Sequence, residues 1–318
     1  MTASPFGYHL LKKDPLPILL ERAPLAIRNR AAEHFLEEDS PVRQKLLADL
    51  YKDRQRERLI VSQQPDGLWP LAEKYTLEEQ MRAMTFLQQL IRMTQMHDFS
   101  VTKEHIAAQK GLIALLKMQK PDGKFPLLLH HHGYALWLLV RFGLAGNPFV
   151  EKGFRWIAKR QRPDGGWLSP AIVPSGISLK TAKSGIWTTL MIFQAFNLHS
   201  RLRNSQTAQL AAEFVLNNFL EPNQTTLFPE PDAWNYLYTD YSESGLFRGG
   251  TLRFIEALAP NPDFQRHPKF KKALNWLLDL QFPDGLFPAI AGRSTEGDYH
   301  VTLRFISALK EIERVSNS

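Results

Sequence analysis

The chain has 318 residues, 44% of them hydrophobic, which is enough to bury a large core, and it contains no cysteine. The lack of cysteine excludes disulfides, thiolate metal ligands and cysteine nucleophiles, and it fits a cytoplasmic protein. The net charge of +7 comes from Lys and Arg spread along the chain without a zinc-finger or RNA-binding motif, so nucleic acid is not an expected partner.

No linker rich in Pro, Gly or Ser divides the sequence, which favours a single domain over residues 1–318. Within it we expect an N-terminal extension and closing helix over residues 1–39 and a repeat region over residues 40–313. The first residues lack the order of a signal peptide, and no apolar run approaches the roughly 18 residues that span a bilayer. No transmembrane segment is predicted, whereas peripheral membrane contact, a homodimer or a second subunit stay open.

Two sets of helices alternate along the chain. Amphipathic helices, with apolar residues near i, i+3, i+4 and i+7, are predicted over residues 42–53, 104–119, 150–161, 207–220 and 267–281. A more apolar helix follows each of them, over residues 77–93, 133–143, 185–196, 248–259 and 300–312. This alternation predicts an all-α fold with an outer amphipathic ring and an inner apolar ring, which a helix near residues 24–37 helps to close.

A turn motif, Gln-x-Pro-Asp-Gly-x-aromatic, follows four of the amphipathic helices. Pro cannot continue the helical hydrogen bonds, Asp accepts from nearby amides, and Gly can adopt positive φ. We expect the aromatic residue to cover the helix end and Gln to bond to the turn of a neighbouring unit. With a degenerate copy at residues 227–229, five units are visible; the clear copies are Gln63–Trp69, Gln119–Phe125, Gln161–Trp167 and Gln281–Phe287.

The inner helices also repeat in sequence. Thr-Leu-Arg-Phe-Ile occurs at residues 251–255 and again at 302–306, and a related core begins at Thr189-Leu190. Equivalent buried helices explain such repetition, so the segments that precede the last two helices should be neighbours in the ring. Polar residues ahead of the inner helices are therefore expected to line one mouth of the barrel.

These repeats resemble those of the terpenoid cyclase and protein prenyltransferase superfamily. Gln63…Gly67-Leu68-Trp69 and Gln161…Gly165-Gly166-Trp167 are similar to the QW motifs of squalene-hopene cyclases, and the similarity covers roughly residues 40 to 313. The resemblance implies an α/α toroid of about five to six helix hairpins. It is specific for the fold and weak for function, because the motifs are structural turns.

The catalytic signatures that the resemblance implies are missing. No two aspartates lie within three residues of each other, so neither the Asp-x-Asp-Asp acid of class II cyclases nor the Asp-Asp-x-x-Asp magnesium motif of class I synthases is present. Around their zinc site, protein prenyltransferases resemble this chain at two places, Asp240-Tyr241-Ser242 and Tyr299-His300. Ser242 stands where those enzymes have a zinc-binding cysteine. Glu243 could supply the anionic ligand that the cysteine would have provided, which makes Asp240, Glu243 and His300 a weak candidate metal site.

Four residues are the candidate catalytic groups: Asp298, His300, Asp240 and Glu243. They precede or begin the two equivalent inner helices, and carboxyl groups brought together there would repel one another and raise a carboxyl pKa. Asp298 is the favoured acid, because His300 could orient it or hold its proton. Capping of the helices in a wet cavity is the structural alternative. The sequence identifies no cofactor, and a divalent cation stays open.

Aromatic residues gather in or ahead of the inner helices, where they could bind an isoprenoid and stabilise a carbocation, or simply fill the barrel. Two functions remain. The first is a cyclase-like or prenyltransferase-like enzyme, acting on or binding an isoprenoid or other hydrophobic substrate in the barrel with a non-standard acid or metal site. The alternative is a noncatalytic toroid that binds a lipid or a protein. The candidate substrate-binding residues are Tyr134, Trp137, Trp187, Trp234, Tyr238, Tyr241, Phe247, Tyr299 and Arg248.

Overall fold

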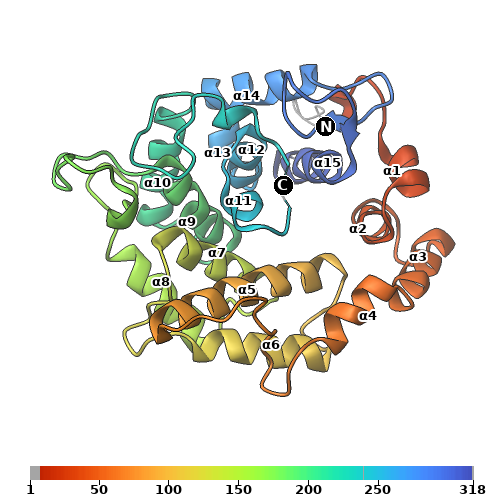
Figure 1. Ribbon diagram of the computed structural model, residues 1–318. Coiled ribbons are helices and arrows are strands. Elements are labelled where there is room, and N and C mark those ends of the chain that lie inside the picture. The colour runs from red at the N-terminus through yellow and green to blue at the C-terminus, as the bar shows by residue number, and fades with distance from the viewer. Residues whose placement is uncertain (1–7, 239, 317–318) are drawn as a thin grey trace.

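The computed structural model describes residues 8–238 and 240–316 and is almost entirely helical (Figure 1). The only strands in these ranges are β1 and β2, two residues each, which pair in antiparallel fashion. The elements, apart from short 3-10 turns, are α1 (Leu16–Arg22), α2 (Leu25–Phe35), α3 (Pro41–Tyr51), α4 (Arg54–Val61), α5 (Glu78–Asp98), α6 (Ile106–Lys117), α7 (Leu129–Arg141), α8 (Pro148–Ala158), α9 (Ile186–Leu198), α10 (Gln206–Asn217), α11 (Glu243–Phe247), α12 (Thr251–Leu258), α13 (Pro262–Gln265), α14 (Pro268–Asp279), β1 (Phe287–Pro288), β2 (Gly297–Asp298) and α15 (Tyr299–Ser316).

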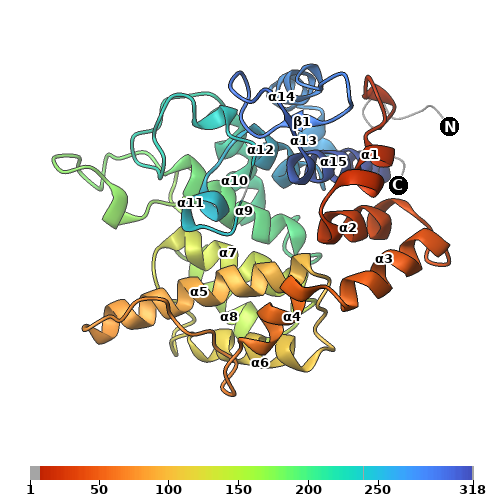
Figure 2. The same cartoon turned by 45° about the vertical axis from the view of Figure 1, so that its right-hand side comes forward.

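Six inner helices form a closed ring. In ring order they are α2, α5, α7, α9, α12 and α15; each contacts the next, and α15 returns to α2 (Figures 1 and 2). Outer helices pack against them, α1 and α3 on α2, α4 and α6 on α5, α8 on α7, α10 on α9, and α14 on α12. The predicted α/α toroid is confirmed by this arrangement. No helix in the described ranges has the length and hydropathy of a membrane span.

The Pro-Asp-Gly turns have one geometry throughout. In the third copy, the Asp164 carboxylate accepts a hydrogen bond from the Gly166 amide, and Gly165 has a φ of 86°. A Cβ on Gly165 would lie 2.4 Å from the Leu210 carbonyl oxygen, so glycine is required on both grounds. The same carboxylate-to-amide bond occurs at Asp66, Asp122 and Asp284.

The motif glutamines join one unit to the next. Gln161 Nε2 donates to the carbonyls of Gly165, in its own turn, and Thr207, in the first turn of the following outer helix, each at 2.8 Å. Gln63 and Gln119 make equivalent pairs of bonds. Gln281 reaches Gly285 and the N-terminal Lys13 carbonyl, so the last unit is bonded to the beginning of the chain. The neighbouring partner is thus an outer helix rather than a neighbouring turn.

The motif aromatics cover helix ends as expected. The Trp167 indole donates to the Ile157 carbonyl at 2.8 Å, and Trp69 does the same to Leu59 at 2.9 Å. The Trp167 amide in turn donates to Thr189 Oγ1, and the Phe287 amide to Thr302 Oγ1. The repeated threonine of the inner helices therefore fixes the turn that precedes it.

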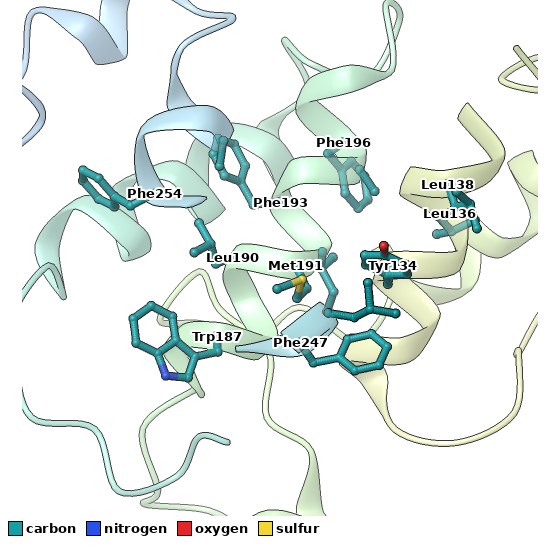
Figure 3. Packing of buried hydrophobic residues seen from close by; sticks show 14 of the residues in the cluster. Tyr134, Leu136, Leu138, Trp187, Leu190, Met191, Phe193, Phe196, Phe247 and Phe254 are labelled. Carbon is teal, nitrogen blue, oxygen red and sulfur yellow. The ribbon is translucent and has the colours of Figure 1, made fainter. Parts of the chain in front are cut away.

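Large side chains fill the interface between inner helices. Phe193 and Phe196 project from α9, and Tyr134 lies on α7 near Phe247, with Met191 beside them (Figure 3). These side chains are buried, so much of the barrel interior is solid core. A ligand site must lie where polar residues interrupt this packing.

Candidate functional site

A cavity of about 470 Å³ lies on the axis of the ring. All six inner helices contribute to its walls, together with the segment 240–246, which runs into α11. Most of the contributions come from within the inner helices rather than from the residues that precede them. Representative residues are Arg30, Asp98, Arg141, Gln194, Glu256 and Arg304.

Asp98, the last residue of α5, is a buried acid in this cavity. It forms an ion pair with Arg30 of α2, and the Tyr241 hydroxyl donates to its other carboxylate oxygen at 2.9 Å. Burial alone would raise the pKa of Asp98, but the Arg30 guanidinium and the His97 and His300 rings together outweigh burial and hold that pKa well below its usual range. Asp98 is therefore ionised at neutral pH and links α5 to α2 and to the 240–246 segment.

Two histidines accompany Asp98. His97 Nδ1 lies 3.7 Å from Asp98 Oδ1, and His97 Nε2 accepts a hydrogen bond from Arg141 Nε at 3.2 Å. Burial lowers the pKa of His97 to about 4. Burial also lowers the pKa of His300, against the opposing effect of the Asp98 carboxylate. Both rings are mainly neutral at pH 7, and a neutral imidazole can accept a proton at one nitrogen and donate from the other.

A second charged group lies on α12 and α15. Arg304 binds Glu256 through two nitrogens, with Nε to Oε1 at 2.8 Å. Burial alone would raise the pKa of Glu256, but Arg304, Arg253 and Arg141 together outweigh burial, so the pKa is lowered. Arg253, one turn before Glu256, also lines the cavity and is 6% exposed. This side of the cavity therefore carries two guanidiniums and one carboxylate.

Aromatic residues of α7 form an apolar part of the wall. The rings of Tyr134 and Trp137 lie 5.1 Å apart, and the Arg141 guanidinium lies 5.1 Å from the Trp137 ring centroid. The Tyr134 hydroxyl is bonded to Thr94 Oγ1 at 3.0 Å. The cavity thus combines an aromatic surface with charged groups.

The four candidate catalytic residues are divided between two settings. Asp240 and His300 line the cavity, although the Asp240 carboxylate accepts from the amide and hydroxyl of Ser242. Asp298 is outside the lining and accepts from the Val301 amide at 2.8 Å as a cap of α15. Glu243 is likewise outside it and bonds to His131 Nε2 at 3.3 Å. The structure therefore brings Asp240 and His300 to one cavity. The Asp298 carboxylate instead caps α15, and the Glu243 carboxylate bonds to His131.

The segments before α12 and α15 do lie side by side. The amides of Leu237 and Tyr238 donate to the Ala289 carbonyl, and Tyr236 pairs with Ile290. Within the described ranges, however, no three His, Asp or Glu side chains are grouped to hold a metal ion. Asp240, Glu243 and His300 accordingly do not form the metal site considered from the sequence.

The candidate substrate-binding residues are also divided. Tyr134, Trp137 and Tyr241 line the central cavity. Trp187 and Trp234 line a separate cavity of about 130 Å³, with their rings 4.5 Å apart.

Four others lie outside both linings. Phe247 is fully buried against His130, His131 and Tyr134. Tyr238 and Tyr299 are half-buried, and Tyr299 packs with the N-terminal helices. The Arg248 guanidinium lies 4.2 Å from the ring centroids of Phe228 and Tyr236.

The triple histidine at the start of α7 is buried. His132 has a structural role, because Nδ1 accepts from the Phe125 amide and Nε2 bonds to the Gly153 carbonyl, each at 3.1 Å. His131 bonds to Glu243, whereas neither ring nitrogen of His130 has a hydrogen-bond partner. None of the three lines the central cavity.

Sequence reasoning missed Asp98, Arg30, Arg141 and Glu256. The helix expected over residues 77–93 continues to Asp98, and Arg30 is distant from it in sequence. A usable signal did exist for Arg253 and Arg304, because an arginine recurs at one position of the otherwise nonionic Thr-Leu-Arg-Phe-Ile core that two inner helices share. Such a repeated buried charge indicates a constraint beyond packing.

No protein-family model matches the chain, and no curated protein matches it in sequence. Among solved structures, a polysaccharide lyase is 12% identical, with coverage of 96% of this chain and 91% of the lyase and a TM-score of 0.47. A glycosyl hydrolase of family 88 from Bacteroides vulgatus is 12% identical, with coverage of 91% and 90% and a TM-score of 0.43. The type II terpene cyclase MstE from Scytonema is 12% identical, with coverage of 85% and 99% and a TM-score of 0.32. Likeness at this level assigns neither activity nor substrate to this chain.

Proposed function

We propose that the protein binds a small, partly hydrophobic molecule, of isoprenoid type, in the central cavity and acts on it through the polar cluster at Asp98. The observation that carries this proposal is the cavity itself, about 470 Å³ in volume and lined from all six inner helices. Ligand sites of small molecules have about 300–1,000 Å³ and combine apolar walls with a few placed polar groups. Tyr134 and Trp137 supply the apolar wall, and Asp98, Tyr241 and His300 supply polar groups.

The polar cluster suits proton transfer. Efficient general acids and bases titrate near the working pH, which favours a histidine over the strongly acidic Asp98. We assign the proton-carrying role to His300 and an orienting role to Asp98, whose charge acts on His300. Partial burial and the Asp98 carboxylate raise the pKa of Tyr241, so its phenol stays protonated as a hydrogen-bond donor. Asp240 remains a candidate polar contact at the same cavity.

Filling the cavity tests this proposal. Ser307 lines it from α15 and corresponds in the repeat to Glu256 of α12 and Gln194 of α9. Ser307→Trp is expected to weaken binding of 8-anilinonaphthalene-1-sulfonate, a fluorescent probe with an aromatic body and an anionic sulfonate, on the order of tenfold, because the indole occupies ligand space. Ser307→Ala is the matched control and should retain binding, as measured by fluorescence titration.

Native mass spectrometry of the purified wild type and of Ser307→Trp can also identify the ligand. A copurified molecule that is present in the wild type and missing from the variant would give the ligand mass. Equal probe affinity in the wild type and in a folded Ser307→Trp protein would contradict the proposal and favour a noncatalytic scaffold that binds partners on its outer surface.

A further inference from the structure

The repeated arginines of the inner helices occupy one structural position. Arg253 is the third residue of α12 in Thr-Leu-Arg-Phe-Ile, and Arg304 has the same place in the copy on α15. Met191 takes this position on α9. Apolar residues thus suffice for the fold at this position, and a guanidinium there requires a partner for its charge.

The carboxylates nearest these arginines are already engaged. Glu256 is bound by Arg304 through both of its oxygens, and Asp98 is bound by Arg30 and Tyr241. Asp240 is bonded to Ser242, and Glu311 to Arg314. Each of the four carboxylates lining the cavity therefore has its own donor.

Arg253 is left without a carboxylate. Its Nη1 lies 3.3 Å from Met191 Sδ, a weak acceptor, and its Nε is buried with no hydrogen-bond partner. Among the described residues, no carboxylate lies within 4.0 Å of it, while the residue is 6% exposed and lines the cavity. A buried charge in this state is costly unless a ligand pairs with it.

Arg141 is a second guanidinium of this kind. Its Nε donates to the neutral His97 ring, and its charge lies over Trp137, with no ion pair to a carboxylate in the described part of the chain. The charge of the Glu256 carboxylate acts on both Arg141 and Arg253, and both guanidiniums line the same cavity. Burial lowers the pKa of each to about 10, so both remain charged at pH 7.

The whole cavity carries an excess of positive charge. Arg30, Arg141, Arg253, Arg304, Lys310 and Arg314 line it, against Asp98, Asp240, Glu256 and Glu311. Its remaining titratable groups are His34, His97, Tyr134, Tyr241 and His300. Burial lowers the pKa of His34 and His97 to about 4, so these two rings add no charge at neutral pH. A neutral hydrocarbon would leave the excess charge uncompensated.

We infer that the ligand of the central cavity carries an anionic group, a carboxylate or a phosphate, which binds to Arg253 and Arg141. Its apolar part then lies against Trp137 and Tyr134. This inference rests on the proposed function and narrows it to organic anions. Arginine suits the role because its fork of donors matches both carboxylate and phosphate oxygens.

Arg253→Met in ligand-free protein gives the first test. Because Met191 already stands at the equivalent position, the variant should fold, and loss of an unpaired buried charge should leave Tm unchanged or raise it by about 2 °C. Phosphate buffer, compared with chloride of equal ionic strength, should raise Tm of the wild type more than that of the variant. The control is Arg266→Met, an exposed arginine on the outer surface whose loss should change neither result.

The second test compares two probes that have the same alkyl tail and differ in the head group. Decanoate should bind the wild type on the order of tenfold more tightly than decanol by isothermal titration, and Arg253→Met should remove this preference without changing decanol binding. Decyl phosphate in place of decanoate distinguishes the two head groups. A clear fall in Tm of Arg253→Met, together with equal affinity for decanoate and decanol in the wild type, would overturn the inference.

The two proposals fail in different ways. If neither decanol nor decanoate binds but phosphate still stabilises the wild type through Arg253, the anion site stands and the hydrophobic ligand is wrong. If decanol binds in the cavity as tightly as decanoate, the hydrophobic ligand stands and the anion site is wrong.

Discussion

Trp167→Ala is expected to lower the free energy of unfolding by about 3–5 kcal/mol, the usual cost of truncating a fully buried tryptophan. Trp167 is 0% exposed, and its ring stacks on Phe196 with centroids 6.1 Å apart. Its indole nitrogen also donates to the Ile157 carbonyl at the end of α8, and the substitution would leave that carbonyl with the Arg160 amide as a remaining donor. The result would show that the motif holds the outer helix to the ring.

Urea denaturation, followed by circular dichroism, measures the effect. Trp276→Ala on α14 is the control, because this tryptophan is only half-buried and lies outside the turn motif. It should cost less than half as much. A Trp167→Ala loss equal to that of Trp276→Ala would mean that the motif contributes no more than an ordinary surface tryptophan.

Acid should lower the free energy of unfolding by about 3 kcal/mol through the protonation of His132 alone. Burial lowers the pKa of His132 to about 4, whereas an unfolded histidine titrates near 6.5. As pH falls below about 6.5, the unfolded chain binds the proton first, so stability is complete above that pH and declines until about pH 4. Protonation would also place a hydrogen on Nδ1, where the Phe125 amide donates.

The measurement is the unfolding free energy between pH 7 and pH 4.5 for the wild type and His132→Asn. The asparagine carbonyl can accept from the Phe125 amide but does not titrate in this range, so the acid-dependent loss should become smaller by about 2 kcal/mol or more. His130, whose pKa burial lowers to about 2, should account for part of the remaining slope. An unchanged slope in His132→Asn would contradict the assignment.

The fold was predictable because its signals are local and repeated. Helix periodicity and the Pro-Asp-Gly turns define each hairpin, and identical hairpins have to pack in identical ways. The bonds of Gln161 and Thr189 explain why these residue types recur, since each satisfies backbone groups at the joint between units. Short-range chemistry of this kind is visible in the sequence alone.

The site was less predictable because ring closure creates it. Arg30 and Asp98 meet only when α2 completes the ring beside α5, and nothing in their sequence neighbourhood indicates this pairing. Tyr241 reaches Asp98 from a third, distant segment. His300 and Asp240 were found because they adjoin the repeated helices, but that criterion could not separate them from Asp298, whose carboxylate caps α15.

A crystal structure of the protein grown with decanoate tests the central claim most directly. The account predicts the ligand in the cavity on the axis of the ring, with its carboxylate bound to Arg253 and Arg141 and its alkyl chain beside Trp137. A decanoate molecule bound only on the outer surface, or one in the cavity with its carboxylate turned away from both arginines, would contradict the account.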